Sequence, residues 1–322
     1  MNFIVSKKKL YSPIVAFIST LILCLIPWDE IREVEYYDRE NYVNYIDNTL
    51  NKINWFDFDG LLSKITFEWG WHKLLQFLTE GLNLNSTIIL FSISFFILFS
   101  SSIFLIRRHN YFSFLFLINP VFIDFCFSQM RLAFTMFLVY LAYYLQKRGN
   151  LLYIPLLLAT PFLHTSAVLF IFLFAVSIFI NKLKYPAEYT KTMLAFLSGL
   201  TVSVVTGPLM SIILGEIGDR RAEYSDMSSP ILYMSFWVVM LPYFLMKGFL
   251  EKGNKDFSFY LTIMILSMIG LNIVFSGYSS RFLAACYPVI ISALLSLKGK
   301  EKPIILISYS AFTIVLWMFW LT

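Results

Sequence analysis

Long apolar runs separated by short polar segments are the feature that most constrains this chain. Of its 322 residues, 58% are hydrophobic and only 14% are charged, whereas a soluble domain carries about 25% charged residues. Apolar stretches of this length are typical of membrane-spanning helices. The pattern predicts an all-α, polytopic integral membrane protein with about 11 transmembrane helices. The runs lie near residues 11–28, 87–106, 111–127, 132–146, 151–163, 165–181, 192–214, 231–246, 257–275, 281–297 and 303–321.

Two stretches need a turn between spans. Phe112–Leu145 has a basic pair at each end, and basic pairs favour the cytoplasmic side. Leu151–Ile180 is too long for one crossing of a ~30 Å hydrocarbon core, and two lysines follow it. We interpret both stretches as hairpins whose polar apices, near Arg131 and near His164, face outward.

The basic residues sort by type across this topology. Thirteen of the sixteen in the cytoplasmic loops are lysines, whereas six of the nine outside are arginines. With the N-terminus in the cytoplasm, the odd span count places the C-terminus outside. The net charge of +5 does not indicate nucleic-acid binding, because the cations flank spans and form no single patch. The cytoplasmic residues are Lys7–Lys9, Arg107, Arg108, Lys147, Arg148, Lys182, Lys184, Lys191, Lys247, Lys252, Lys255, Lys298, Lys300 and Lys302.

Two external loops are substantial, but neither is large enough for a separate soluble domain, so residues 1–322 are expected to form one transmembrane domain. The first loop, residues 29–86, separates spans 1 and 2, and the second covers residues 215–230. Near the end of the first loop, residues 71–82 place their apolar side chains on one helical face. This spacing predicts an amphipathic helix that lies on the bilayer.

Arginines on the outer side are candidate anion ligands, because a guanidinium presents a planar fork of donors suited to phosphate. Arg131 begins a span, where charge is costly and usually functional. It either binds an anion or pairs with Asp124. Arg281 is expected at a similar depth, whereas Arg220 and Arg221 either contribute to the site or form a solvated network with neighbouring acids.

The same side supplies candidates for proton transfer. His164 lies at the second apex and could move a proton or bind phosphate, or it could only cap a helix. Glu68 and Asp38 are candidate general bases among the acids of the first loop. Asp57-Phe58-Asp59 resembles a metal-binding Asp-x-Asp, but a turn before Gly60 explains it equally well. We therefore predict no metal site.

Four short motifs occur in a characteristic order. They are Asp-x-x-x-Tyr after the first span, Glu-x-Gly before the second, Arg at the start of the fourth with a basic turn after it, and a His-x-Ser-Ala apex. Over residues 30–180 this order resembles bacterial polysaccharide polymerases of the EpsG type, which include many O-antigen polymerases called Wzy. The chain departs at Leu132, where that family commonly has Gln. The motifs here are Asp38–Tyr42, Glu68–Gly70, Arg131 with Lys147-Arg148, and His164–Ala167.

The resemblance implies a glycosyltransferase at the outer face of the bacterial inner membrane. It would join polyprenyl-diphosphate-linked oligosaccharide repeat units, need no cofactor, and work beside a flippase and a chain-length regulator. The outer arginines, Arg131 and Arg281 above all, would bind the diphosphate beside His164, with Glu68 or Asp38 as base. A flippase or transporter of the same lipid-linked oligosaccharide is the alternative, although such proteins often contain internal repeats that this sequence lacks. A membrane acyltransferase and an inactive assembly scaffold explain fewer of these residues.

Overall fold

The computed structural model describes residues 7–32, 36–50, 58–185, 187–207, 209, 212, 215–216, 230–251, 255–272 and 279–321. All regular structure in these residues is helical, in agreement with the predicted all-α class. The elements are α1 (Lys7–Leu25), α2 (Trp28–Ile31), α3 (Tyr37–Asn44), η1 (Tyr45–Thr49), α4 (Leu61–Thr66), α5 (Trp69–Gln76), η3 (Phe77–Gly81), α6 (Ser86–Arg108), η4 (Tyr111–Leu117), α7 (Pro120–Phe127), α8 (Met130–Lys147), α9 (Tyr153–Leu163), α10 (Ala167–Lys182), α11 (Glu188–Thr206), α13 (Ile231–Leu250), α14 (Phe257–Asn272), α15 (Ser279–Ala285), α16 (Tyr287–Ser296) and α17 (Lys302–Leu321).

Some of these helices have the length and composition of membrane spans. Among the described residues, α6, α13 and α17 are each long and apolar enough to cross a bilayer. The pair α7 and α8 has the required composition only when taken together, and the two helices meet at a bend of 100°. Several further apolar helices, including α9, α10, α14 and α16, are shorter. The protein is therefore a membrane protein, and the number of spans stays a prediction.

Two of the expected spans are not continuous helices. The run at 111–127 consists of the 3-10 helix η4 and the eight-residue helix α7. The break follows from Asn119 and Pro120, because the Asn119 side chain accepts from the amide of Val121 and caps α7. An eight-residue helix is only about 12 Å long. The run at 281–297 is likewise divided at Cys286 into α15 and α16.

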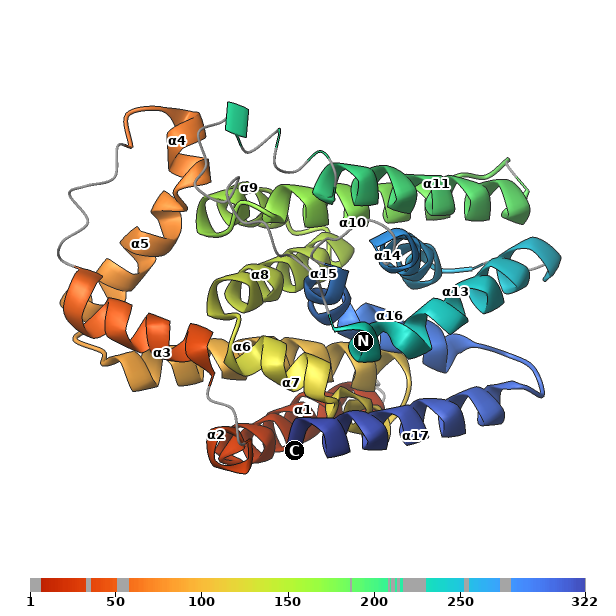
Figure 1. Cartoon of the computed structure of the whole chain (residues 1–322), viewed down its shortest axis with the longest axis horizontal. Coiled ribbons are helices and arrows are strands. Elements are labelled where there is room, and N and C mark those ends of the chain that lie inside the picture. Colours follow the sequence, from red (N-terminus) through yellow and green to blue (C-terminus); the bar gives the residue numbers. More distant parts are fainter. Residues whose placement is uncertain are drawn as a thin grey trace, which may run out of the picture. The chain divides into compact units, whose positions relative to one another are not determined.

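The described chain divides into two compact units. The first comprises residues 1–168 with 318–322, and the second comprises residues 169–317. In the first unit, α6 packs against α1 and α8, and α8 packs against α9 (Figure 1). Fully buried apolar side chains such as Ile97, Ala133 and Met136 fill these contacts. This helical layer supports the shorter helices α3, α4 and α5 of the first loop.

The second unit is built around α14. Nearly all side chains of this helix are buried, and it packs against α11, α13, α15 and α16. A Cβ atom at Gly199 of α11 would overlap the backbone of Met264, so these two helices approach closely only because position 199 has no side chain. Ser203 then donates to Asn272 at 2.6 Å across the same contact. Small residues at helix contacts are typical of membrane proteins.

Candidate active site

The helix α3 brings the acid and the phenol of the first motif to one side. Asp38 and Tyr42 are four residues apart, which places them on the same helical face. Asp38 is exposed, whereas Tyr42 is half-buried, with its ring 5.9 Å from that of Trp71. Burial raises the pKa of Tyr42, an effect that the Arg131 guanidinium reduces without reversing. The Tyr42 hydroxyl is therefore protonated at neutral pH and can both accept and donate.

The backbone at Glu68 has a left-handed conformation. Its φ is 54° and its ψ is 44°, at the junction between α4 and α5. Residues other than glycine adopt this region rarely, and such strain is often found at functional sites. The conformation turns the carboxylate inward, where only 4% of the residue remains exposed. A buried carboxylate needs partners, and Glu68 has them.

Gly70 explains the second half of the Glu-x-Gly motif. A Cβ atom at this position would lie 2.9 Å from Cβ of Phe162 and 3.0 Å from its carbonyl oxygen. The start of α5 therefore rests directly on the end of α9. Thr165, just after α9, adds a bond to the neighbouring helix α4, because its hydroxyl donates to the carbonyl of Ile65 at 3.1 Å. The close approach places Glu68 beside the His164 apex.

Arg131, the second residue of α8, joins the two motifs of the first loop. Its Nε donates to the Tyr42 hydroxyl at 2.9 Å, and its Nη1 forms a salt bridge with Oε2 of Glu68. The Arg131 side chain is 33% exposed, and none of the described residues accepts from Nη2. The positive end of the α8 dipole lies at the same place. The guanidinium of Arg131 is thus held through Nε and Nη1, and its Nη2 is left to bind a ligand.

The His164 apex completes the polar cluster. The backbone amide of Thr165 donates to Oε1 of Glu68 at 3.3 Å. His164 Nδ1 accepts from the amide of Ser166 at 3.2 Å, which places the proton of the neutral ring on Nε2. The same Nδ1 lies 3.7 Å from Oε1 of Glu68. A proton added at Nδ1 would therefore remove the acceptor for the Ser166 amide and allow an ion pair between His164 and Glu68.

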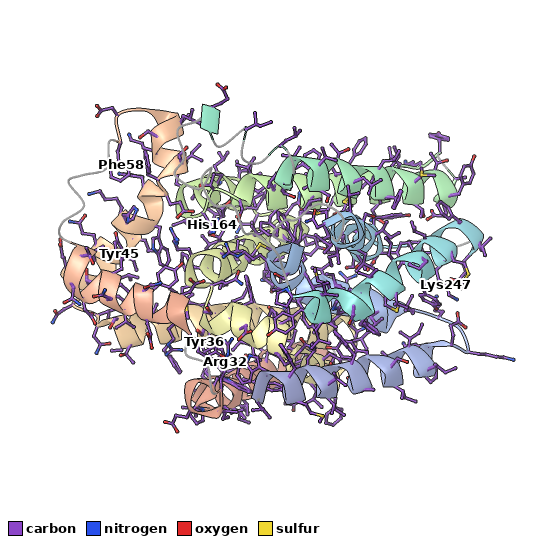
Figure 2. All side chains as sticks on the ribbon, in the orientation of Figure 1. Arg32, Tyr36, Tyr45, Phe58, His164 and Lys247 are labelled. Carbon is purple, nitrogen blue, oxygen red and sulfur yellow. The ribbon has the colours of Figure 1, made fainter. Side chains whose placement is uncertain are left out.

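Aromatic residues flank this cluster. The Tyr45 hydroxyl is hydrogen-bonded to Nδ1 of His72, whose Nε2 donates to the carbonyl of Phe67 at 3.0 Å. The Phe58 ring lies 6.2 Å from that of His72. Figure 2 shows Tyr45 on the helix that continues α3, Phe58 in the segment before α4, and His164 at the end of α9. The polar cluster thus has an aromatic border on the side of the first loop.

Asp124 is not the partner of Arg131, so that alternative is wrong. Its Oδ1 accepts from Nη1 of Arg32 and from Nε1 of Trp320, both at 3.0 Å. The Arg32 guanidinium also lies over the Tyr36 and Trp320 rings, and Figure 2 shows Arg32 beside Tyr36. The 100° bend between α7 and α8 separates Asp124 from Arg131.

Of the remaining predicted site residues, one belongs to the second unit and the others lie outside the described residues. Arg281 is exposed on α15 of the second unit. Arg220, Arg221 and Asp57 lie outside the described residues. Within the described ranges, no three His, Cys, Asp or Glu residues are grouped closely enough to hold a metal ion.

The predicted amphipathic helix at 71–82 exists as α5 and η3, but its apolar face contacts protein. Trp71 and Leu75 are 1% and 0% exposed, because α5 packs on α9. Leu82, at the far end, is exposed. The prediction that this face lies on the bilayer is therefore wrong for its first half. Sequence reasoning placed Tyr42 in the first motif but did not select it as a site residue, and its contact with Arg131 was not foreseen.

Comparison with known proteins agrees with the motifs. The EpsG family profile matches residues 10–322. No curated protein and no solved structure matches the chain. The family match covers both compact units and every motif of the polar cluster, and EpsG-like proteins are polymerase-type membrane proteins. The chain therefore belongs to the EpsG family.

Proposed function

We propose that this protein polymerises polyprenyl-diphosphate-linked oligosaccharide repeat units into O-antigen or a similar surface polysaccharide. The reaction would be of the Wzy type, at the outer face of a bacterial inner membrane. Membership of the EpsG family supports a polymerase-like role. The observation that carries the proposal is the half-satisfied guanidinium of Arg131, fixed by Glu68 and Tyr42 on one edge and open on the other.

Arg131 would act on the leaving group. Transfer breaks the bond between the anomeric carbon of the donor and the diphosphate oxygen, and the electron pair leaves with the diphosphate. The acceptor hydroxyl forms the new glycosidic bond and loses its proton. Preorganised donors that stabilise such developing charge commonly supply much of a rate enhancement. Arg281, Arg220 and Arg221 remain proposed as further phosphate ligands, and His164 as a second polar group beside Arg131.

Asp38 is the better candidate for the base. Both oxygens of Glu68 are engaged, one by Arg131 and the other by the Thr165 amide. Asp38 is exposed and lies on the helical face of Tyr42, whose hydroxyl accepts from Arg131, and it forms no salt bridge with Arg131. A proton acceptor needs a carboxylate oxygen that the substrate can reach. We therefore assign Glu68 to positioning Arg131, and Asp38 to proton transfer.

The two acids should respond differently to substitution. Asp38→Asn is expected to lower kcat by ~10²–10⁴-fold, the usual contribution of a general base, with little change in donor KM. Glu68→Gln should raise donor KM as well, because Arg131 loses its charged partner. Steady-state kinetics with purified protein and lipid-linked repeat units would separate the two roles. A fall in kcat without a KM change for Glu68→Gln, with Asp38→Asn active, would reverse the assignment.

The polymerase activity itself can be tested by reconstitution. Purified protein in lipid vesicles should convert polyprenyl-diphosphate-linked repeat units into longer lipid-linked chains and release polyprenyl diphosphate. Cells without the protein should carry polysaccharide limited to a single repeat unit. Long chains that survive deletion, in cells with no second polymerase, would rule the proposal out. Accumulation of repeat units on the inner leaflet would favour a flippase instead.

A further inference from the structure

A second feature of the first unit lies at the other end of α8. A half-open cavity of about 620 Å³ lies between α6 and α8 and reaches Pro13 of α1. Arg131 and Lys147, sixteen residues apart on α8, are separated by about 24 Å along the helix axis. The cavity is therefore distinct from the candidate active site. We call it the basic cavity. Its lining includes Phe99, Ile103, Phe137, Leu141, Arg107 and Lys147.

The wall of the basic cavity is apolar. Aliphatic and aromatic side chains from α6 and α8 make up most of it, and Ser100 is one of its few small residues. The Phe96 and Phe137 rings stack 5.1 Å apart beside it. An apolar wall of this kind offers water few hydrogen-bond partners. In a membrane protein such a surface therefore contacts hydrocarbon. The deeper part of the cavity therefore suits an acyl chain.

The rim of the basic cavity is cationic. Arg107 of the lining lies 5.2 Å from the centre of the Tyr144 ring, and Arg148, which is not itself part of the lining, lies 4.4 Å from the same ring. Lys147 lies 5.5 Å from the centre of the Tyr143 ring. Arg108, over the Phe104 ring, is also hydrogen-bonded to Tyr143. Aromatic faces attract cations and hold them in place without neutralising their charge.

Acidic residues are scarce in the part of the sequence that supplies these cations. Between Gly81 and Ala187 the sequence contains one acid, Asp124, and Arg32 and Trp320 occupy its Oδ1. No salt bridge of the described residues involves Arg107, Lys147 or Arg148. Nε of Arg107 is buried and lacks a hydrogen-bond partner in the described chain. The rim thus has unmatched positive charge and an open donor, which a phosphate would satisfy.

We propose that the basic cavity binds an anionic glycerophospholipid, with one acyl chain between α6 and α8 and the phosphodiester on Arg107, Arg108 and Lys147. An anionic phospholipid is the ligand that would use both the apolar walls and the cationic rim. A free anion would use the rim alone, and a neutral lipid would use the walls alone. Anionic lipids attract basic residues beside membrane helices. The lipid would hold the cytoplasmic ends of α6 and α8 together.

Lipid competition on the full-length protein would test this site. Protein purified in detergent is mixed with equal amounts of phosphatidylglycerol and phosphatidylcholine of the same chains, and retained lipid is measured by native mass spectrometry. We expect at least tenfold preference for phosphatidylglycerol. Equal retention of the two lipids would overturn the proposal. Displacement of phosphatidylglycerol by millimolar glycerophosphate would show a free-anion site and would overturn it too.

Three variants locate the bound lipid. Arg107→Gln with Arg108→Gln should remove the preference, and Ser100→Phe should lower total retention by filling the apolar part. The matched control is Lys182→Gln with Lys184→Gln, which removes the same charge elsewhere and should keep the preference. Loss of preference in this control would mean unspecific attraction and would contradict the site. The preference of the unsubstituted protein decides the question even if a variant fails to fold.

Discussion

Arg131→Lys is expected to abolish detectable polymer while the protein stays in the membrane at its normal level. Lysine keeps the positive charge but has a single nitrogen in place of the planar fork, which uses separate nitrogens for Tyr42 and Glu68 and leaves a third for the diphosphate. Disrupting a desolvated charge pair costs roughly 2–5 kcal/mol. Even the lower value is about a 30-fold loss in rate. The measurement is chain length on gels, combined with kinetics of the purified variant.

The control for this substitution is the neighbouring ion pair. Asp124→Asn removes the negative charge that pairs with Arg32 and weakens the acceptor for Arg32 and Trp320, which lie in the same unit but outside the polar cluster. It should lower abundance or melting temperature while the remaining protein keeps most of its activity. If Arg131→Lys polymerises normally, Arg131 is not the diphosphate ligand. If it only lowers abundance, its role is structural.

Gly70→Val should be nearly as damaging, although residue 70 touches no substrate in the proposed mechanism. The added atoms would meet the backbone of Phe162, where even a single Cβ lies at 2.9–3.2 Å. Overpacking of this kind typically costs ~1–3 kcal/mol. Here it would also lift α5 from α9 and move Glu68 away from Arg131. We expect at least a tenfold loss of polymerisation rate and a higher donor KM.

Alanine variants provide a graded control. In a helix, Gly→Ala normally stabilises by up to ~1 kcal/mol, so a destabilised Gly70→Ala variant would report the contact with Phe162. Gly60→Ala, ten residues earlier, introduces a Cβ with no atom within 4 Å and should behave as the unsubstituted protein. Thermal unfolding in detergent and the same kinetic assay measure both. Normal stability and activity of Gly70→Val would contradict the tight contact of α5 with α9.

Hydrophobicity alone predicted the helical class and the positions of the longest spans. α6, α13 and α17 coincide with three of the apolar runs, because a long uninterrupted apolar segment has few alternatives in lipid. The shorter elements were harder to predict. Asn119-Pro120 is a readable start signal for a helix, yet it lies inside an apolar run that suggested a continuous span. The cap at Asn119 starts a new helix there, although the apolar run continues through it.

The residues of the polar cluster could be named from the sequence, but the contacts between them could not. Arg131 was selected because a charged residue at the start of a span is energetically costly. Glu68, Asp38 and His164 were selected from the motifs. Their pairing depends on the bend between α7 and α8, which turns Asp124 toward Arg32, and on the left-handed backbone of Glu68. Neither property has a clear signature in one sequence. Proximity along the chain therefore suggested the wrong partner for Arg131.

The residues that contact Arg131 are synthesised before it, which bears on how the arginine enters the membrane. Glu68 precedes the arginine by 63 residues and Tyr42 precedes it by 89. At ~5–20 residues per second, Glu68 emerges several seconds earlier. The acceptors of the guanidinium are thus already synthesised when α8 enters the bilayer. A circular permutant that places residues 36–85 after α8 would have to insert the arginine before its carboxylate exists.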